Sequence, residues 1–240
     1  MKQRRLTKKE QRSLRQQGVL NEDNQINIGK FNLNDVTPLT PHQMIAFQCW
    51  NSQNLLLHGC AGTGKTFIGM YLALRDVLDQ QFKKLVIVRS AVPTRDVGFL
   101  PGSLEEKLKV YEQPYSAIAN TLFNRGDAYS ILKNKVMLEF IPTSFIRGTT
   151  LDNCVVLVDE INNLTFHELD SVITRLGPKT KMILCGDQSQ TDLKFKDEQV
   201  GLIHFMDIVN KMPSFRRVDF NTDDIVRSGL VKEYIVAKES

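Results

Sequence analysis

The chain contains Gly59-Cys60-Ala61-Gly62-Thr63-Gly64-Lys65-Thr66, which matches the pattern G-x-x-x-x-G-K-[ST] at every fixed position. The glycines of this pattern let the backbone turn tightly and direct its N–H groups toward phosphate oxygens. Lys65 supplies a positive charge for the β- and γ-phosphates, and the Thr66 hydroxyl can ligate Mg²⁺. We therefore predict that residues 59–66 form a P-loop that holds a nucleoside triphosphate together with Mg²⁺.

The sequence on either side of this loop supports the prediction. An apolar run at 54–58 precedes the loop, and residues 67–79 follow it with apolar side chains at helical spacing. A strand, a loop and an amphipathic helix are the context in which this pattern binds phosphate. The alternative is a glycine-rich surface turn that contains Lys-Thr by chance, and the flanking segments disfavour it.

The composition is that of an ordinary globular protein. Hydrophobic residues make up 42% and charged residues 24% of the 240 positions, which suffices for one substantial core. No apolar run has the length of a membrane span, and the basic N-terminus lacks the apolar segment of a secretory signal. The cysteines are dispersed, which favours free thiols in a reducing compartment. We expect a cytoplasmic protein that does not enter a membrane.

The net charge of +4 is unevenly distributed along the chain. Basic residues crowd the N-terminus, at Lys2, Arg4, Arg5, Lys8, Lys9, Arg12 and Arg15. Such an arm can bind the phosphates of a nucleic acid, or it can be a solvated tail without a partner, and the composition favours neither. We expect a basic polar tail over residues 1–36 and a single domain over residues 37–240.

Short apolar runs alternate with helical patterns in the rest of the chain. Strands are predicted at 84–88, 136–140, 154–158, 181–185 and 216–220, and helices at 41–50, 104–124, 166–176, 201–211 and 229–238. Thr40 and Ser103 are candidate caps for the helices that follow them. Nearly all-apolar strands suit a sheet that is buried on both faces, so the pattern predicts an α/β, doubly wound, mainly parallel sheet.

Two further loops are predicted to lie beside the P-loop. Asp159 and Glu160 end the strand at 154–158, so Asp159 is a candidate Mg²⁺ ligand and Glu160 a candidate base for the attacking water. The loop after the next strand contains Gln190, whose amide could contact both the γ-phosphate and that water. The alternative for this third loop is a polar turn. Gln43 carries the donor and acceptor needed to recognise an adenine edge.

Together these segments resemble the PhoH family of phosphate-starvation-inducible P-loop ATPases, which is related to the superfamily 1 helicase core. The resemblance covers about residues 38–236 and rests on the P-loop and on Leu39–Gln43, Val88–Val92, Gly98–Gly102, Ile146–Leu151, Val158–Asn163, Gly186–Leu193 and Asp224–Arg227. It implies an ATPase with a RecA-like fold. It also implies that Gln43 contacts adenine, that Gln190 belongs to a helicase-type third motif and that Arg227 is an arginine finger.

The chain departs from the family pattern in two places. Ile161 and Asn162 stand where the family often has Ala and Gln, and Ser90 stands where it usually has Pro. The first change removes a side chain that could couple ATP to a partner. Family members occur in bacteria and their phages, and the short length suits a phage-encoded version.

The length allows only one RecA-like lobe, so the arginine that stabilises the transferred phosphoryl group has to come from elsewhere. We expect a head-to-tail homo-oligomeric ring, with a hexamer as one candidate, in which Arg227 or, in reserve, Arg147 reaches the next subunit. The alternative for Arg227 is a surface ion pair with Asp223 or Asp224.

Two uses of ATP remain open. One is remodelling of single-stranded RNA or DNA, which is suggested by the basic tail and by Arg89, Arg95 and Arg147. The other is a nucleotide-gated switch that binds a protein partner and turns over slowly. A small-molecule kinase is disfavoured, because the predicted Glu160 and Gln190 would orient water.

Overall fold

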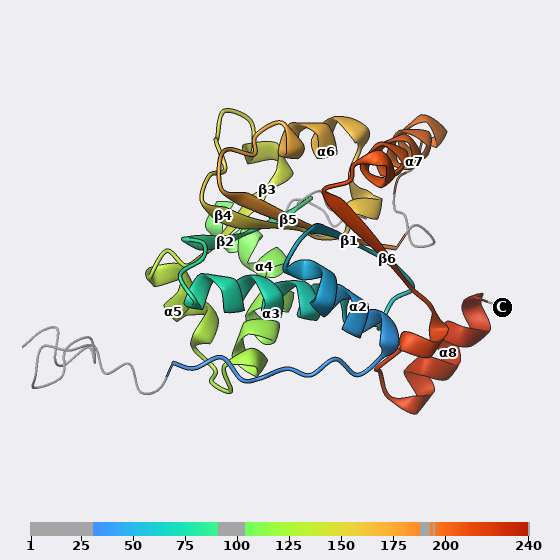
Figure 1. Ribbon diagram of the computed structural model, residues 1–240, viewed down its shortest axis with the longest axis horizontal. Coiled ribbons are helices and arrows are strands. Elements are labelled where there is room, and N and C mark those ends of the chain that lie inside the picture. Colours follow the sequence, from blue (N-terminus) through green and yellow to red (C-terminus); the bar gives the residue numbers. More distant parts are fainter. Residues whose placement is uncertain (1–30, 91–103, 188–192, 194, 240) are drawn as a thin grey trace, which may run out of the picture. The chain divides into compact units, whose positions relative to one another are not determined.

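A six-stranded sheet forms the centre of the part of the chain that the structure describes, which comprises residues 31–90, 104–187, 193 and 195–239. The structure is a computed structural model (Figure 1). The strands are β1 (Asn54–Gly59), β2 (Lys84–Arg89), β3 (Leu138–Pro142), β4 (Cys154–Val158), β5 (Thr180–Gly186) and β6 (Phe215–Phe220). They lie in the order β3-β2-β4-β5-β1-β6, and each neighbouring pair is parallel. The predicted α/β fold with a parallel sheet is therefore confirmed.

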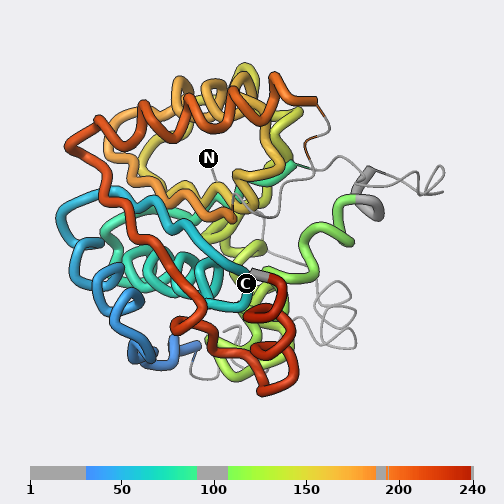
Figure 2. Tube along the Cα trace, turned by 90° about the vertical axis from the view of Figure 1, so that its right-hand side faces the viewer, coloured from blue at the N-terminus to red at the C-terminus, as the bar shows by residue number. Residues whose placement is uncertain are grey.

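Helices cover both faces of this sheet. They are α2 (Pro41–Trp50), α3 (Lys65–Leu78), α4 (Leu104–Leu122), α5 (Ala128–Asn134), α6 (Phe166–Ile173), α7 (Lys196–Lys211) and α8 (Gly229–Glu239). Figure 1 shows α6 and α7 on one face and α2 and α3 on the other, and Figure 2 shows the same layers after a 90° turn. Coverage on both sides explains why β4 is buried at all five positions and consists of apolar residues.

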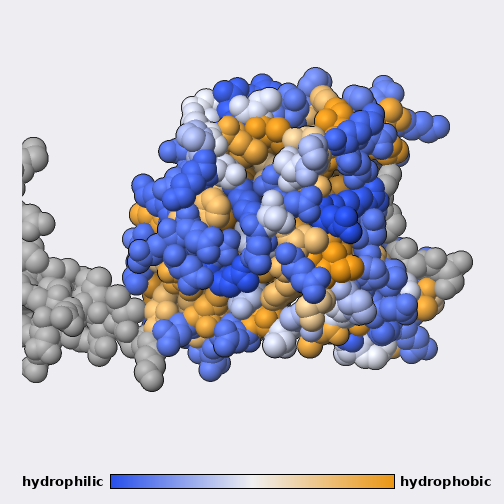
Figure 3. All heavy atoms as spheres, in the orientation of Figure 1, coloured by the Kyte–Doolittle hydropathy of each residue, from blue (hydrophilic) through white to orange (hydrophobic). Residues whose placement is uncertain are grey.

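The surface seen in Figure 3 is largely polar, with small apolar areas between the polar side chains. Among the described residues, no helix combines the length and the apolar character that crossing a bilayer requires.

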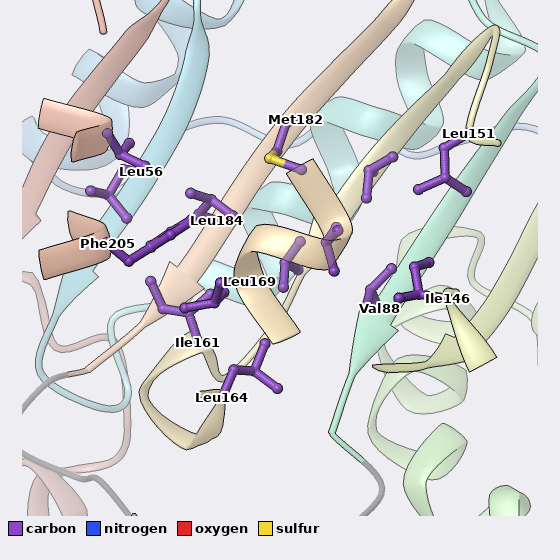
Figure 4. Close-up of a cluster of buried hydrophobic side chains, with 14 of the residues drawn as sticks. Leu56, Val88, Ile146, Leu151, Ile161, Leu164, Leu169, Met182, Leu184 and Phe205 are labelled. Carbon is purple, nitrogen blue, oxygen red and sulfur yellow. The ribbon is translucent and has the colours of Figure 1, made fainter. Parts of the chain in front are cut away.

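One large apolar cluster fills the space between the sheet and the helices α6 and α7. It includes Leu56 of β1, Val156 of β4, Leu184 of β5, Leu169 of α6 and Phe205 of α7. Figure 4 shows several of these side chains directed toward one another across the strands and α6. This packing holds the strand ends that carry the polar loops in fixed positions.

Most predicted elements are present, several of them with different bounds, and one helix was not predicted. The strand expected at 136–140 begins at Leu138, because Val136 has a φ of +57° in the turn that ends α5. The helix α5 itself was not predicted, since two turns of helix carry too little periodicity to detect. Helix α7 begins at Lys196 rather than at residue 201. The proposed cap Ser103 lies outside the described residues.

The start of α2 follows the prediction in detail. Thr40 caps the helix, its hydroxyl accepts a hydrogen bond from the backbone N–H of Gln43, and Pro41 occupies the first turn. This cap places Gln43 on the side of α2 that is buried against the P-loop.

The parallel sheet brings the loops that follow β1, β4 and β5 to one edge, because the carboxyl ends of all its strands lie there. Only β5 separates β1 from β4. The P-loop and the residues after β4 therefore lie two strands apart in space although they are distant in the sequence.

The junction between β1 and the P-loop requires glycine. Gly59 has a φ of +123° and pairs with Phe220 of β6, and a Cβ at this position would lie 1.9 Å from the Phe220 carbonyl oxygen. Since both the backbone conformation and the space exclude a side chain, even alanine would force β1 and β6 apart.

We expect Gly59→Ala to lower the free energy of unfolding by about 2–4 kcal/mol, measured by urea denaturation. Gly148→Ala is the matched control, because Gly148 has a φ of +83° but no atom within 4 Å of its Cβ position. The control is expected to lose only about 1 kcal/mol. Equal losses in the two variants would show that the contact with Phe220 has no role in stability.

Candidate functional site

The P-loop lies between β1 and α3, and its backbone has the conformation that the glycine pattern predicts. Gly62 and Gly64 both have positive φ angles, of +77° and +85°. Gly64 is the N-cap of α3, and as a glycine it leaves the first N–H groups of this 14-residue helix without a side-chain cap. Uncapped N–H groups at the positive end of a helix dipole form a binding site for an anion.

Lys65 points its ammonium group into this loop. Its Nζ donates hydrogen bonds to the carbonyl oxygens of Gly59 and Cys60, at 2.6 and 2.7 Å. The side chain is only 9% exposed, and burial lowers its pKa while Asp187 and Asp159 act in the opposite direction. A buried cation inside a ring of backbone dipoles is placed to attract phosphate oxygens.

Thr66 and Asp159 meet beside the loop. The Thr66 hydroxyl donates to Asp159 Oδ1 at 2.9 Å, although the two residues are 93 positions apart. Burial raises the pKa of Asp159, and the hydrogen bonds from Thr66 and from Tyr115, whose hydroxyl donates to Oδ2 at 3.0 Å, oppose that shift. A buried carboxylate next to a hydroxyl fits a hard divalent cation such as Mg²⁺, whose other ligands would be phosphate oxygens and water.

Glu160 follows in an uncommon backbone conformation, with a φ of +52°. Its Oε2 accepts a hydrogen bond from Arg89 Nη2 at 2.5 Å, and the side chain is 41% exposed. Burial raises the pKa of Glu160, and the charge of Arg89 acts against this. The carboxylate therefore lies next to Asp159, is held at one oxygen and is accessible to water.

Helix α4 contributes two tyrosines that the sequence did not reveal as site residues. The Tyr115 side chain is fully buried and bonds to Asp159, and the ring centroid of Tyr111 lies 6.0 Å from the guanidinium carbon of Arg89. From the sequence, Arg89 was considered as a basic residue for nucleic acid and as part of the family-like segment Val88–Val92, but not as a partner of Glu160. Tyrosines carry no motif of their own, so only the fold could connect α4 to the carboxylates.

The third loop is described only at its start. Gln190 lies outside the described residues, so its role stays a prediction. Asp187 is buried, and its backbone N–H donates to Asn162 Oδ1 at 3.1 Å. Asn162, one of the two departures from the family pattern, thus links the loop after β4 to the loop after β5. The neighbouring Ile161 packs closely against Gly186: a Cβ added to Gly186 would lie 2.4 Å from Ile161 Cγ1.

Gln43 lies against the P-loop, and its amide group is already engaged. Its Oε1 accepts from the backbone N–H of Leu39 at 2.7 Å, and its Nε2 donates to the carbonyl oxygen of Thr63 at 3.0 Å. The residue is buried. Gln43 therefore ties the start of α2 to the loop, which places it beside the region where a nucleotide would lie.

Arg227 lies beside the P-loop of its own chain. A Cβ on Gly62 would come within 2.9 Å of Arg227 Cγ, and the backbone N–H of Val226 donates to the Gly62 carbonyl oxygen at 3.1 Å. Asp224 bonds to His42 Nδ1 at 2.7 Å, and within the described part of the chain no ion pair joins Arg227 to an aspartate. Arg147, by contrast, is exposed beyond β3 at the far edge of the sheet.

A hollow of about 410 Å³ adjoins the loop on the side of β6. It is lined by His58, Gly59, Cys60, Asp187, Asp219, Phe220, Asn221 and Thr222. Apart from this hollow, the site combines a cationic loop, a helix N-terminus and two adjacent carboxylates, which suits a polyphosphate with a divalent cation.

Comparison with known structures supports the fold. The large terminase of a thermophilic bacteriophage aligns with 82% of this chain and 50% of its own, with a TM-score of 0.52 and 11% sequence identity. The RecA-like, single-domain P-loop fold predicted from the sequence is confirmed by this likeness together with the parallel sheet.

Curated relatives are similar in sequence over three quarters of the chain. A PhoH-like protein of Bacillus subtilis (strain 168) is 35% identical over 181 residues, which is 75% of this chain and 56% of the relative. A PhoH-like protein of Synechocystis sp. is 36% identical over 183 residues, again 75% of this chain and 55% of the relative. The chain thus spans about half the length of the curated relatives it matches.

A protein-family model described as PhoH-like protein matches residues 35–239. This match takes in the P-loop, the carboxylates after β4 and α8, and we conclude that the chain belongs to the PhoH-like protein family.

Proposed function

We propose that this protein is a Mg²⁺-dependent ATPase. The observation that carries the proposal is the 2.9 Å contact between Thr66 and Asp159, beside a P-loop whose lysine is buried. Thr66 and Asp159 would hold Mg²⁺, which when bound supplies positive charge to the phosphate oxygens. Lys65 neutralises further negative charge on the β- and γ-phosphates, and the N–H groups of the loop fix their position.

Glu160 is proposed to orient the attacking water and to accept its proton. It follows the proposed Mg²⁺ ligand directly, and it is accessible to solvent. Burial, which raises its pKa, also makes the carboxylate a stronger base. Gln190 is kept as a proposed contact to the γ-phosphate, and Gln43 as a proposed contact to adenine that also supports the loop through Thr63.

We expect Glu160→Gln to bind ATP normally but to lower kcat by about 10²–10⁴-fold, because the amide cannot accept a proton. Lys65→Ala is expected to lose ATP binding, because the buried charge that faces the phosphates is removed. Phosphate release and binding of a fluorescent ATP analogue measure the two effects.

Glu139→Gln is the matched control, because Glu139 pairs with Lys84 near the other end of β2. It should leave both quantities unchanged. A Glu160→Gln variant that hydrolyses ATP at the parent rate would refute the assignment of Glu160.

We further propose that hydrolysis is coupled to single-stranded RNA or DNA. Arg147 and Phe145 are both exposed just after β3, at the carboxyl-terminal end of the strands, which is also the end at which the P-loop follows β1. Arg147 lines a cavity of about 220 Å³ together with Thr143, Ser144, Glu168 and Ser171, and the Thr143 hydroxyl is bonded to Glu168. An exposed aromatic ring and an exposed arginine two residues apart suit stacking of a base and contact with its phosphate. The basic residues of the tail and Arg95 lie outside the described residues.

Addition of single-stranded RNA or DNA is expected to raise the ATPase rate, and the increase should fall steeply as salt is added. The single change Phe145→Ala, which leaves Arg147 in place, should weaken this stimulation by about tenfold while the unstimulated rate is retained. A rate that responds to no nucleic acid at any salt concentration would rule the coupling out.

The second candidate is a nucleotide-gated switch that binds a protein partner. One observation favours it: α8 packs on the P-loop through Ile235 and Cys60, yet exposes Leu230 at 78% and Tyr234 at 69%. A nucleotide in the loop could therefore change an apolar surface. Partner capture that depends on ATP and persists after nuclease treatment would favour the switch over the nucleic-acid proposal.

The proposed assembly is a homo-oligomeric ring, in a cytoplasm whose reducing conditions suit the dispersed thiols. Arg227 lies beside its own P-loop, which supports action on the nucleotide of the same chain. Arg147 follows β3 at one edge of the sheet, whereas the P-loop follows β1 near the other edge. In a head-to-tail contact, Arg147 is thus the better candidate for reaching the ATP of the next subunit.

Mixing inactive variants tests this assignment. If Arg147 acts across the interface, mixed Lys65→Ala and Arg147→Ala subunits should regain part of the ATPase activity, whereas Lys65→Ala with Arg227→Ala should not. The exposed Arg175 provides the control substitution, Arg175→Ala. Light scattering in ATP gives the mass, and a fully active monomer would contradict the ring.

A further inference from the structure

We propose that Arg89 is a positioning residue that holds the Glu160 carboxylate in place for the attacking water, with α4 as its support. This inference rests on the proposed ATPase function and adds to it a residue for which the P-loop pattern has no position.

The sheet brings Arg89 to Glu160. Strands β2 and β4 are parallel neighbours with Val88 opposite Val158, and the backbone N–H of Asp159 donates to the Val88 carbonyl oxygen at 2.9 Å. The chain therefore leaves both strands at the same level, and Arg89 Nη2 reaches Glu160 Oε2 at 2.5 Å. The short distance makes this a direct, charge-assisted hydrogen bond.

The pair differs from an ordinary surface ion pair. The Arg89 side chain is only 18% exposed, so its charge is weakly screened by solvent. Glu160 has a positive φ, a strained conformation for a residue with a side chain. A strained backbone next to a partly buried arginine restricts the orientations that the carboxylate can adopt, and restricted orientation is what a water-positioning group requires.

Helix α4 supports this arrangement at two points one turn apart. Tyr111 lies near the Arg89 guanidinium, with 6.0 Å between the ring centroid and the guanidinium carbon. Tyr115, four residues later and thus on the same face of the helix, donates to Asp159. The two adjacent carboxylates are consequently held by one helix, one of them through Arg89 and the other directly.

A double-mutant cycle tests the proposal. Arg89→Gln is expected to lower kcat about tenfold or more, while the KM for ATP and binding of a fluorescent ATP analogue change less than about twofold. In a Glu160→Gln background the same substitution should cause no further loss, because the group that Arg89 positions is already gone. Arg89→Lys keeps the charge and should retain more activity than Arg89→Gln. Because the Glu160→Gln variants are expected to be slow, their rates are measured as phosphate release in a single turnover.

The matched control is Lys84→Gln, which breaks the ion pair with Glu139 at the start of the same strand and should leave kcat unchanged. Parent kcat in Arg89→Gln, or an equal loss with and without Glu160→Gln, would overturn the proposal. If Arg89→Gln is too unstable to assay, the same test is made with Arg89→Lys: its loss of kcat is compared between the parent protein and the Glu160→Gln variant. Parent activity in Glu160→Gln alone would instead remove the proposed base, and this inference with it.

Discussion

The contact between Thr66 and Asp159 depends on the parallel arrangement of the sheet. Asp159 directly follows β4, Thr66 lies at the start of the helix after β1 and the P-loop, and β5 alone separates these two strands. Since parallel strands place all their carboxyl ends together, a helix that follows one strand and a carboxylate that follows another can share one cation. The apolar contacts among the strands and α6 and α7 keep that distance fixed.

The same edge collects polar groups that are costly to bury separately. Asp159 receives hydrogen bonds from Thr66 and Tyr115, and Lys65 donates to the carbonyl groups of its own loop. Each charged group has partners of the opposite polarity, which offsets the cost of removing it from water. These partners keep the polar groups of the site in defined positions before a charged ligand binds.

The contacts of Gln43 and Arg227 bear on the roles proposed for these two residues. The Gln43 amide is bonded to Leu39 and Thr63, so it supports the loop whether or not it also contacts a base. Arg227 packs against Gly62 of its own chain and therefore lies beside the P-loop of the same subunit. Gln43 was selected for its amide group and for the resemblance, and Arg227 for the resemblance alone; neither environment could be deduced from spacing along the chain.

Local pattern was sufficient to predict the P-loop, the cap at Thr40, the strand at 154–158 and the two carboxylates after it, because each depends on neighbours in the sequence. The start of β3 and the short α5 were missed, since a positive φ at Val136 and two helical turns leave little periodic signal. Arg89 and Tyr115 bond to carboxylates that lie 71 and 44 positions further along the chain, and Tyr111 of α4 lies near Arg89 of β2. Such contacts arise only when the sheet is assembled, because strand order, and not the sequence interval, sets which chain segments become neighbours.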